Sequence, residues 1–458
     1  MRILLINSAD IGGGAEGSAR RLFHALRERG HEAWLAVGRK RSDDANIFKI
    51  PNDEYRSQWA NFIYRKLRAS QSKHLSPQAI TLLRIFAEPR RWIERQLGVE
   101  DFNYPASRHI FDLLPSKPDV VHMFNLHGEY FDLRTLPWFS KQAPIILNPR
   151  DAWLLSGHCA HSFECNRWNA GCGHCPDLTI YPLAKRDATS HNWKRKKKIY
   201  SQSRIYAATP SQWLMRKIES SMMASGIVKS RVIPTGIDLS LFFPADKKET
   251  RLRLGLPLDS KIILFAANNA QTSQWKDYAT AQSVFEMVAA QRIKEKFLFI
   301  TLGGEGKPAN IGESEVRFIP LQRDRKIVAD YYRAADLYLH TSRADTYPNT
   351  VMESLACGTP VIASNVGGIP EQIKGFGTSE PNFHDIESAN GILIKPGDTG
   401  AMIDAIIRLL TDELLRFRLG QNAYEDSRQR FDFNQQVDQF IAWYQEVIED
   451  WPSIFKSH

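Results

Sequence analysis

The stretch DLYLHTSRADTYPNTVMESLACGTPVIASNVGGIPE, residues 336–371, decides the fold of this chain. Its opening apolar run at 336–340 predicts a buried strand. Pro348 then precedes a helical pattern at 349–357, and it suits the first turn of a helix because proline lacks a backbone N–H and fixes its own φ angle. Gly358 is a typical helix stop. The first half of the stretch is therefore expected to be a strand, a polar loop and a helix.

The second half of the stretch repeats this pattern. The apolar run at 360–363 predicts a strand, and the Gly367–Gly368 pair with Pro370 predicts a tight turn before a second helix. In a parallel sheet both loops lie at the carboxyl ends of their strands, where open α/β sheets bind ligands. The free N–H groups of two helix starts at that edge favour a phosphate.

Two acids flank the first predicted helix: Asp345 lies in the loop before it and Glu353 lies within it. Carboxylates repel a phosphate, so we expect these two to accept hydrogen bonds from ribose and sugar hydroxyls. The pattern indicates a sugar-nucleotide site. A solvated aspartate and an ordinary helical glutamate are the alternative.

The stretch resembles the carboxy-terminal signature of the retaining GT-B glycosyltransferases of family 4. The resemblance rests on Asp345, Glu353, the run ACGTP at 356–360, and Gly367-Gly368 with Glu371. That signature usually carries two glutamates, so Asp345 is a conservative departure. The resemblance implies an α/β fold of the GT-B type, with two Rossmann-like parallel-sheet domains facing a cleft and a carboxy-terminal helix that crosses back to the first domain.

The resemblance also implies a reaction: transfer of a hexose, with retention, from a nucleotide-diphosphate sugar to a lipid-linked or growing surface saccharide. Lys276 falls where the family keeps a lysine against the donor diphosphate, and the catalytic set implied is Lys276, Asp345, Glu353 and His127. No catalytic metal or other cofactor is expected, because the lysine and helix dipoles would neutralise the leaving group. The implied donor-binding residues are Gly13, Gly14, Lys276, Asp345, Tyr347, Pro348, Asn349, Thr350 and Glu353.

Two positions depart from the family pattern. Many members place an arginine a few residues before the lysine, where this chain has Ala270 and Gln271, and members often carry histidine where Arg150 stands. These departures keep open a second interpretation, a non-catalytic protein that binds a nucleotide sugar or acts as a scaffold. If the protein is an enzyme, the missing charge has to come from one of Arg323, Arg325 or Arg343.

Two further strand patterns end in polar residues. The run DVVHMF at 119–124 leads into NLHG at 125–128, which is similar to a segment of the family, and the run at 145–147 leads to Arg150 and Asp151. We expect His127, Arg150 and Asp151 on the acceptor side of the cleft. A histidine in such a loop is, alternatively, structural.

A glycine motif near the amino terminus supports a third interpretation. Gly12, Gly14 and Gly17 satisfy G-x-G-x-x-G, which is typical of dinucleotide sites. The next strand runs into a basic segment at 39–41 rather than the acid that an NAD ribose requires, which leaves an NADP-dependent oxidoreductase. The family resemblance instead implies that Gly13 and Gly14 lie close to the donor diphosphate. Alternatively, the glycines only form the first turn.

The segment 55–95 combines basic and aromatic residues. It holds nine Lys or Arg against two Glu, interleaved with large apolar side chains at helical spacing. Such a pattern suits a helix that lies on anionic lipid. An amphipathic helix that covers the sheet with a solvated basic face is the alternative.

Four cysteines lie close together in an insert at 151–182, which resembles a cysteine-bearing insert of polysaccharide-assembling members of the family. The C-x₂-C spacing is typical of zinc ligands, and the other two thiols complete a tetrahedral set, so the sequence predicts a structural zinc. Disulfides and free thiols are the alternatives, and disulfides are disfavoured inside a cell. The four residues are Cys159, Cys165, Cys172 and Cys175.

Composition agrees with a large enzyme of 458 residues, 43% hydrophobic and 24% charged. No apolar run is long enough for a membrane span, and the amino terminus does not suit a signal peptide, so we expect a cytoplasmic protein, peripheral at the inner membrane face. The net charge of +9 favours an anionic surface, and lipid rather than nucleic acid, because no nucleic-acid module is recognisable. The expected domains are 1–244, 245–430 and a final helix region at 431–458.

Overall fold

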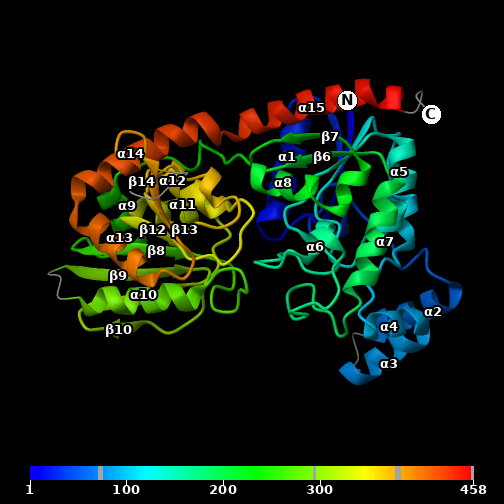
Figure 1. Cartoon of the computed structure of the whole chain (residues 1–458), viewed down its shortest axis with the longest axis horizontal. Helices are drawn as coiled ribbons and strands as arrows, with labels where there is room; N and C mark the ends of the chain where they lie inside the picture. The colour runs from blue at the N-terminus through cyan, green and yellow to red at the C-terminus, as the bar shows by residue number, and fades with distance from the viewer. Residues whose placement is uncertain (71–75, 292–294, 377–382, 455–458) are drawn as a thin grey trace. The chain divides into compact units, whose positions relative to one another are not determined.

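A computed structural model describes residues 1–70, 76–291, 295–376 and 383–454. Two predicted segments are therefore described only in part: residues 71–75 of the segment 55–95, and residues 455–458 of the final helix region 431–458, lie outside the described residues. The chain forms two compact units (Figure 1). The first comprises Met1–Thr209, Leu214–Ile233 and the chain from Gln439 on, and the second comprises Pro210–Trp213 and Pro234–Asp438.

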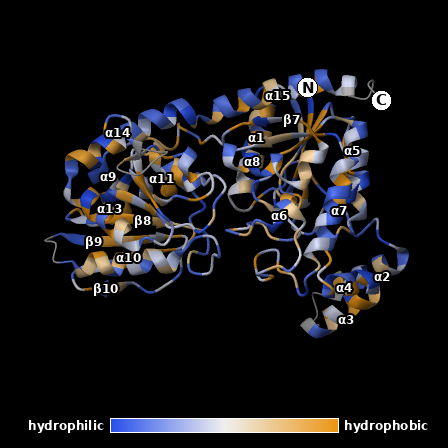
Figure 2. Cartoon of the chain, in the orientation of Figure 1, coloured by the Kyte–Doolittle hydropathy of each residue, from blue (hydrophilic) through white to orange (hydrophobic). Residues whose placement is uncertain are grey.

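The first unit is built on a sheet in the order β3-β2-β1-β4-β5-β6-β7, in which every neighbouring pair is parallel. The apolar runs of the sequence form its central strands, which are buried on both faces as parallel strands usually are (Figure 2). The strands are β1 (Arg2–Ala9), β2 (Glu32–Arg39), β3 (Ile47–Lys49), β4 (Val120–Met123), β5 (Ile145–Leu147), β6 (Ile205–Thr209) and β7 (Ile227–Val232).

Helices surround this sheet and extend from it. A separate group of three, α2 to α4, follows β3 and has a small core of its own, centred on Ile63 and Leu67. The helices are α1 (Gly14–Glu28), α2 (Gln58–Ser70), α3 (Pro77–Ala87), α4 (Pro89–Gln96), α5 (Leu136–Gln142), α6 (Arg167–Ala170), α7 (Thr189–Ser201) and α8 (Gln212–Glu219).

The second unit holds a larger sheet in the order β10-β11-β9-β8-β12-β13-β16-β14-β15, parallel except between β10 and β11. The strands are β8 (Ser260–Ala266), β9 (Lys296–Leu302), β10 (Ala309–Ile311), β11 (Ser314–Ile319), β12 (Leu337–His340), β13 (Val361–Ser364), β14 (Gly375–Phe376), β15 (Phe383–His384) and β16 (Gly391–Ile394).

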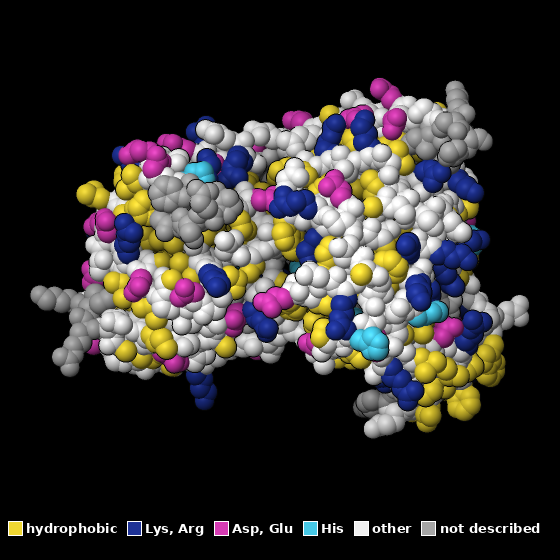
Figure 3. All heavy atoms as spheres, in the orientation of Figure 1, with side chains coloured by type: hydrophobic (Ala, Val, Ile, Leu, Met, Phe, Trp, Pro, Cys, Tyr) yellow, Lys and Arg dark blue, Asp and Glu magenta, His cyan; other side chains and the backbone are white. Residues whose placement is uncertain are grey.

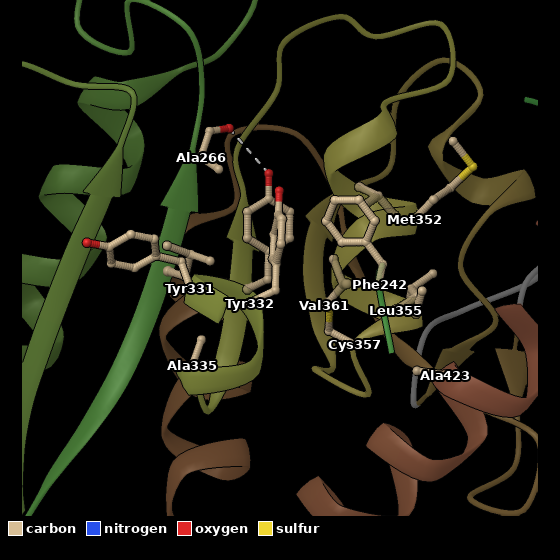
Figure 4. Close-up of a cluster of buried hydrophobic side chains, with 14 of the residues drawn as sticks. Phe242, Ala266, Tyr331, Tyr332, Ala335, Met352, Leu355, Cys357, Val361 and Ala423 are labelled. Atoms are coloured by element: carbon tan, nitrogen blue, oxygen red, sulfur yellow. Dashed lines mark hydrogen bonds between the residues drawn. The ribbon is translucent and has the colours of Figure 1, made fainter. Parts of the chain in front are cut away.

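Two apolar layers cover the faces of this sheet. Side chains alternate along each strand, so Leu264 and Tyr338 join one layer while Ile263 and Leu339 join the other. Figure 4 shows the first layer, where Phe242 packs near Leu355 and Cys357. The helices are α9 (Lys247–Leu254), α10 (Tyr278–Ala290), α11 (Arg325–Ala334), α12 (Asn349–Ala356), α13 (Thr399–Thr411) and α14 (Glu413–Arg430).

One predicted element is absent from this unit. The turn at Gly367–Gly368 leads to a single 3₁₀ turn, Ile369–Glu371, and the prediction of a second helix there is wrong. The backbone N–H of Lys374 donates to the Asn390 side chain (2.8 Å), and the Asn390 N–H donates to the Lys374 carbonyl (3.0 Å). These bonds draw the chain into β14 before a helix can continue.

The last helix, α15 (Phe433–Ile454), begins in the second unit and continues in the first, as the resemblance implied. Its apolar stripe is buried at Phe440, Trp443 and Tyr444. No helix in the described parts of the chain is long and apolar enough to cross a membrane.

Candidate functional site

The second sheet reverses its strand order between β8 and β12. The connection after β8 leads to β9 on one side, and the connection after β12 leads to β13 on the other side. Both connections begin at the carboxyl edge of the sheet. Ligands bind at such switch points in open α/β sheets. Lys276 lies in the first loop and Asp345 in the second.

Backbone pairing joins these two loops to each other. Lys276 and Ser342 form an antiparallel bridge, and the N–H of Asp277 donates to the Thr341 carbonyl (2.7 Å). The N–H of Arg343 donates to the Trp275 carbonyl (2.9 Å). The two loops therefore hold Lys276 and Asp345 in a fixed relation, although 69 residues separate them in sequence.

Lys276, Asp345 and His340 form one cluster at this edge. The Lys276 ammonium pairs with the Asp345 carboxylate, and its Nζ lies 3.2 Å from His340 Nε2. His340 also contacts the hydroxyls of Tyr338 (Nδ1, 2.9 Å) and Ser342 (Nε2, 2.8 Å). His340 was not among the predicted site residues. Its signal was a polar residue at the carboxyl end of a buried strand.

The electrostatics of this cluster favour a neutral histidine beside an ion pair. Burial, and next the charge of Lys276, lower the pKa of His340 to about 4. Burial raises the pKa of Asp345, but the charge of Lys276 and hydrogen bonds from His340 and Lys276 hold it well below its ordinary value. The cluster thus presents one ammonium and one carboxylate near neutral pH.

Glu353 lies on α12, and its contacts include residues outside the cluster. Its carboxylate accepts a long hydrogen bond from the Tyr332 hydroxyl (3.4 Å) and lies 3.9 Å from Arg325. Burial raises the pKa of Tyr338, and the charges of Asp345 and Glu353 raise it further, so both acids lie close to that phenol. The structure therefore brings Glu353 near the cluster.

The start of α12 is free of side-chain caps. Pro348 is its N-cap residue, with an extended backbone and no capping hydrogen bond, so no side chain occupies the N–H groups of the first turn at Asn349 and Thr350. Gly367 fixes the adjacent loop, because a Cβ there would lie 1.8 Å from the Asp345 carbonyl. Its φ of +61° is also one that glycine adopts readily. Tyr347 is a neighbour, and its ring packs near Phe431.

In the first unit, His127 and Asp151 form a pair (2.7 Å) across the loops after β4 and β5. Burial lowers the pKa of His127, but the charge and hydrogen bond of Asp151 raise it above its ordinary value overall. Arg150 is adjacent, with its N–H bound to the Asn125 side chain (3.1 Å), and burial lowers its pKa to about 10. A cavity of about 150 Å³ lies beside His127, with Trp153 in its lining.

Gly13 and Gly14 connect β1 to α1. Gly13 is the N-cap residue and Gly14 is the first residue of the helix. A Cβ on Gly13 would meet only the Glu16 carboxylate, at 3.5 Å, so packing around this residue does not require glycine. The first turn carries Glu16, whose charge disfavours a phosphate at this helix start.

The cysteine insert shows no ligand shell. Among the described residues, no group of three or more His, Cys, Asp or Glu side chains is placed to hold a metal ion. Burial raises the pKa of Cys159 and of Cys172 to about 11 each, so as placed these are neutral thiols. Cys175 Sγ lies 3.4 Å from His158 Nε2, and all four cysteines are free. The geometry does not fit a closed zinc site, and the zinc stays a prediction.

A family model matches most of the second unit. Residues 246–426 are matched by the model of glycosyl transferases group 1. Over these residues the second unit is similar to the group 1 glycosyl transferases. It includes Lys276, His340, Asp345 and Glu353.

Curated relatives match over part of their length. The chain is 30% identical to a D-inositol 3-phosphate glycosyltransferase of Xylanimonas cellulosilytica over 241 residues, 48% of this chain and 52% of the relative. It is 25% identical to the putative teichuronic acid biosynthesis glycosyltransferase TuaC of Bacillus subtilis over 281 residues, 60% of this chain and 64% of the relative. The chain spans about half the length of several of the curated relatives it matches.

Solved structures match the fold of nearly the whole chain. A sucrose-phosphate synthase from Thermosynechococcus elongatus has a TM-score of 0.63 at 18% identity, covering 98% of this chain and 99% of its own. HepE of Anabaena, in complex with UDP and glucose, has a TM-score of 0.59 at 16% identity, covering 97% and 99%. The protein therefore has the GT-B fold, with two Rossmann-like parallel-sheet domains.

Proposed function

We propose that this protein transfers a hexose from a nucleotide-diphosphate donor to a saccharide acceptor, with retention at the anomeric carbon. The observation that supports it best is the Lys276–Asp345 pair at the switch point of the second sheet. Paired loops hold a cation and a carboxylate where such sheets bind ligands. A diphosphate sugar needs both: a cation for its phosphates and an acceptor for its hydroxyls.

The donor's charge is assigned to Lys276 and to the start of α12. Lys276 would exchange part of its pairing with Asp345 for the diphosphate and neutralise the charge that develops on the leaving group. The uncapped N–H groups at Asn349 and Thr350 would bind a phosphate oxygen. Arg325, 3.9 Å from the Glu353 carboxylate, is the candidate for the second cation that the loop at 270–271 lacks.

The two acids would hold the hydroxyls. Asp345, released from Lys276 in part, would accept from the transferred sugar, and Glu353 would accept from the ribose. Glu353 suits this role because it lies on α12, the helix whose first turn would bind the phosphate. HepE of Anabaena has been solved in complex with UDP-glucose and with UDP and glucose, which supports a nucleotide-sugar donor here.

For the acceptor we propose a lipid-linked or growing surface saccharide, as TuaC acts in teichuronic acid biosynthesis by its description. In the first unit, the His127–Asp151 pair, with Arg150 beside it, forms the acceptor-side group. Asp151 would orient the imidazole, which could then bind or deprotonate an acceptor hydroxyl. Packing does not require a glycine at Gly13, which agrees with a residue that is small so that a ligand can approach the backbone.

The replacement Glu353→Ala tests the donor site. We expect calorimetric affinity for the preferred nucleotide sugar, chosen from a thermal-shift panel, to fall at least tenfold, since a ribose contact of about 1.5 kcal/mol or more is lost. Glu387→Ala, at an exposed acid of the same unit, is the control and should bind as the parent does. Unchanged affinity in Glu353→Ala would reject the assignment.

Two other interpretations have their own outcomes. A non-catalytic binder would bind the nucleotide sugar in calorimetry but release no nucleotide diphosphate with any saccharide acceptor. An NADP-dependent oxidoreductase would bind NADP through the loop at Gly12–Gly17 and would change nicotinamide absorbance. The anomeric configuration of the product, read by proton NMR, tests retention.

A further inference from the structure

Helices α2 and α3 carry an exposed apolar surface. Trp59, Phe62, Leu82 and Phe86, here called the apolar patch, are exposed by 58%, 54%, 55% and 64%. The rings of Trp59 and Phe62 stack at 6.3 Å, and the Trp59 indole donates to the Phe86 backbone carbonyl (2.9 Å), which joins α2 to α3 at the patch. In Figure 3, hydrophobic side chains gather over this group of helices.

The patch is not the packing core of these helices. Their core consists of Ala60, Ile63, Leu67 and Ala87, which are buried. The helices therefore already have an apolar interior, and the patch residues lie outside it. Contiguous exposed apolar surface of this kind usually marks a binding surface.

The charges around the patch are positive. The segment 55–95 contains two acids, and both form ion pairs. Glu88 pairs with Arg56 (2.6 Å) and Arg91 (2.9 Å), and Glu94 pairs with Arg90 (3.0 Å).

Three other cations in the described part of this segment have no such partner. Within the described residues, no carboxylate pairs with Arg65, Lys66 or Arg84, which are all exposed. Lys66 lies over the Phe62 ring at 5.6 Å, so a cation borders the patch directly.

We propose that the apolar patch and these three cations bind a membrane surface that contains anionic lipid. Aromatic side chains enter the boundary between headgroups and acyl chains, and basic side chains beside them pair with lipid phosphates. A second copy of the chain would bring like charges together, which disfavours self-association through this surface. The role of this membrane binding, which is access to a lipid-linked acceptor, rests on the proposed function. The membrane-binding surface itself is proposed independently of that function.

Vesicle sedimentation of the full chain tests the proposal. We expect binding to vesicles of phosphatidylcholine and phosphatidylglycerol in equal parts, and little binding to phosphatidylcholine alone. The combined replacement Trp59→Ser, Phe62→Ser and Phe86→Ser should abolish binding. Arg65→Gln, Lys66→Gln and Arg84→Gln should each weaken it about fivefold and reduce its dependence on salt.

The matched control is Leu414→Ser with Phe417→Ser, which removes two exposed apolar side chains from α14. These replacements should leave vesicle binding unchanged. Donor binding is measured on every variant, and its retention shows that the variants fold.

Three outcomes would overturn the proposal: no binding to either vesicle, equal binding to both, or parental binding by the serine and glutamine variants. A dimer in sedimentation velocity that the serine variant dissolves would name a second copy as the occupant and would also overturn it. Failure of vesicle binding with donor binding intact would affect only this proposal. Failure of donor binding with vesicle binding intact would affect only the proposed function.

Discussion

His340 determines how the Lys276–Asp345 pair is held. Its Nε2 lies 3.2 Å from the Lys276 ammonium, 2.8 Å from the Ser342 hydroxyl and 3.6 Å from the Asp345 carboxylate, and its Nδ1 lies 2.9 Å from the Tyr338 hydroxyl. A protonated ring would place a second buried positive charge beside Lys276. The neutral form therefore keeps the net charge of the cluster near zero until a donor binds.

This arrangement predicts a pH dependence of stability. The pKa of His340 is about 4 in the folded protein and about 6.5 unfolded. Between these values the unfolded chain binds more protons, so the free energy of unfolding falls as pH falls, by about 3 kcal/mol in all from this group. In urea unfolding at pH 7 and pH 4.5, His340→Gln should show a smaller loss than the parent.

The control for this experiment is His109→Gln, at an exposed histidine of the first unit. It should lose as much stability as the parent between the two pH values. An equal pH dependence in His340→Gln and the parent would contradict a depressed pKa at His340.

At the scale of elements, α15 is attached to the first sheet by a buried polar contact. Tyr444 contacts His122 Nδ1 on β4 (2.7 Å), and the Asn148 amide lies 3.1 Å from the other ring nitrogen. Burial lowers the pKa of His122 well below its ordinary value. Since the amide donates to Nε2, Nδ1 carries the proton and needs an acceptor.

Replacing Tyr444 by Phe removes that acceptor and leaves a buried donor without a partner. We expect a loss of about 1–3 kcal/mol in the free energy of unfolding, measured with urea. Leu414→Ala, on the exposed surface of α14, should change it by no more than about 0.5 kcal/mol. A value for Tyr444→Phe as small as the control's would show that the contact is not needed.

The cysteine insert supports another prediction at this scale. The C-x₂-C spacing at 172–175 still predicts zinc, whereas the described side chains are not gathered around a metal. Protein purified without chelator should contain about one zinc per chain, and Cys172→Ser should contain less. Folded protein free of zinc would remove the prediction and agree with the described geometry, which gathers no set of metal ligands.

Across the whole molecule, the sequence predicted buried strands more securely than the structure that follows a glycine turn. The run at 145–147 forms β5 over the predicted residues because it is continuously apolar and buried on both faces. The prediction of a helix after Gly368 was wrong because the segment instead hydrogen-bonds to Asn390, a residue farther along the chain, and joins the sheet. A local pattern does not contain that information.

The candidate site shows the same division. The sequence by itself pointed to the residue types: spacing and the family resemblance indicated Asp345 in a loop and Glu353 on a helix, and the family resemblance indicated Lys276. Only the tertiary structure decided that Lys276 pairs with Asp345, that His340 joins them, and that Arg325 is the arginine beside Glu353. The reason is physical: strand order in the sheet and pairing between loops set these contacts, and both depend on segments distant in sequence.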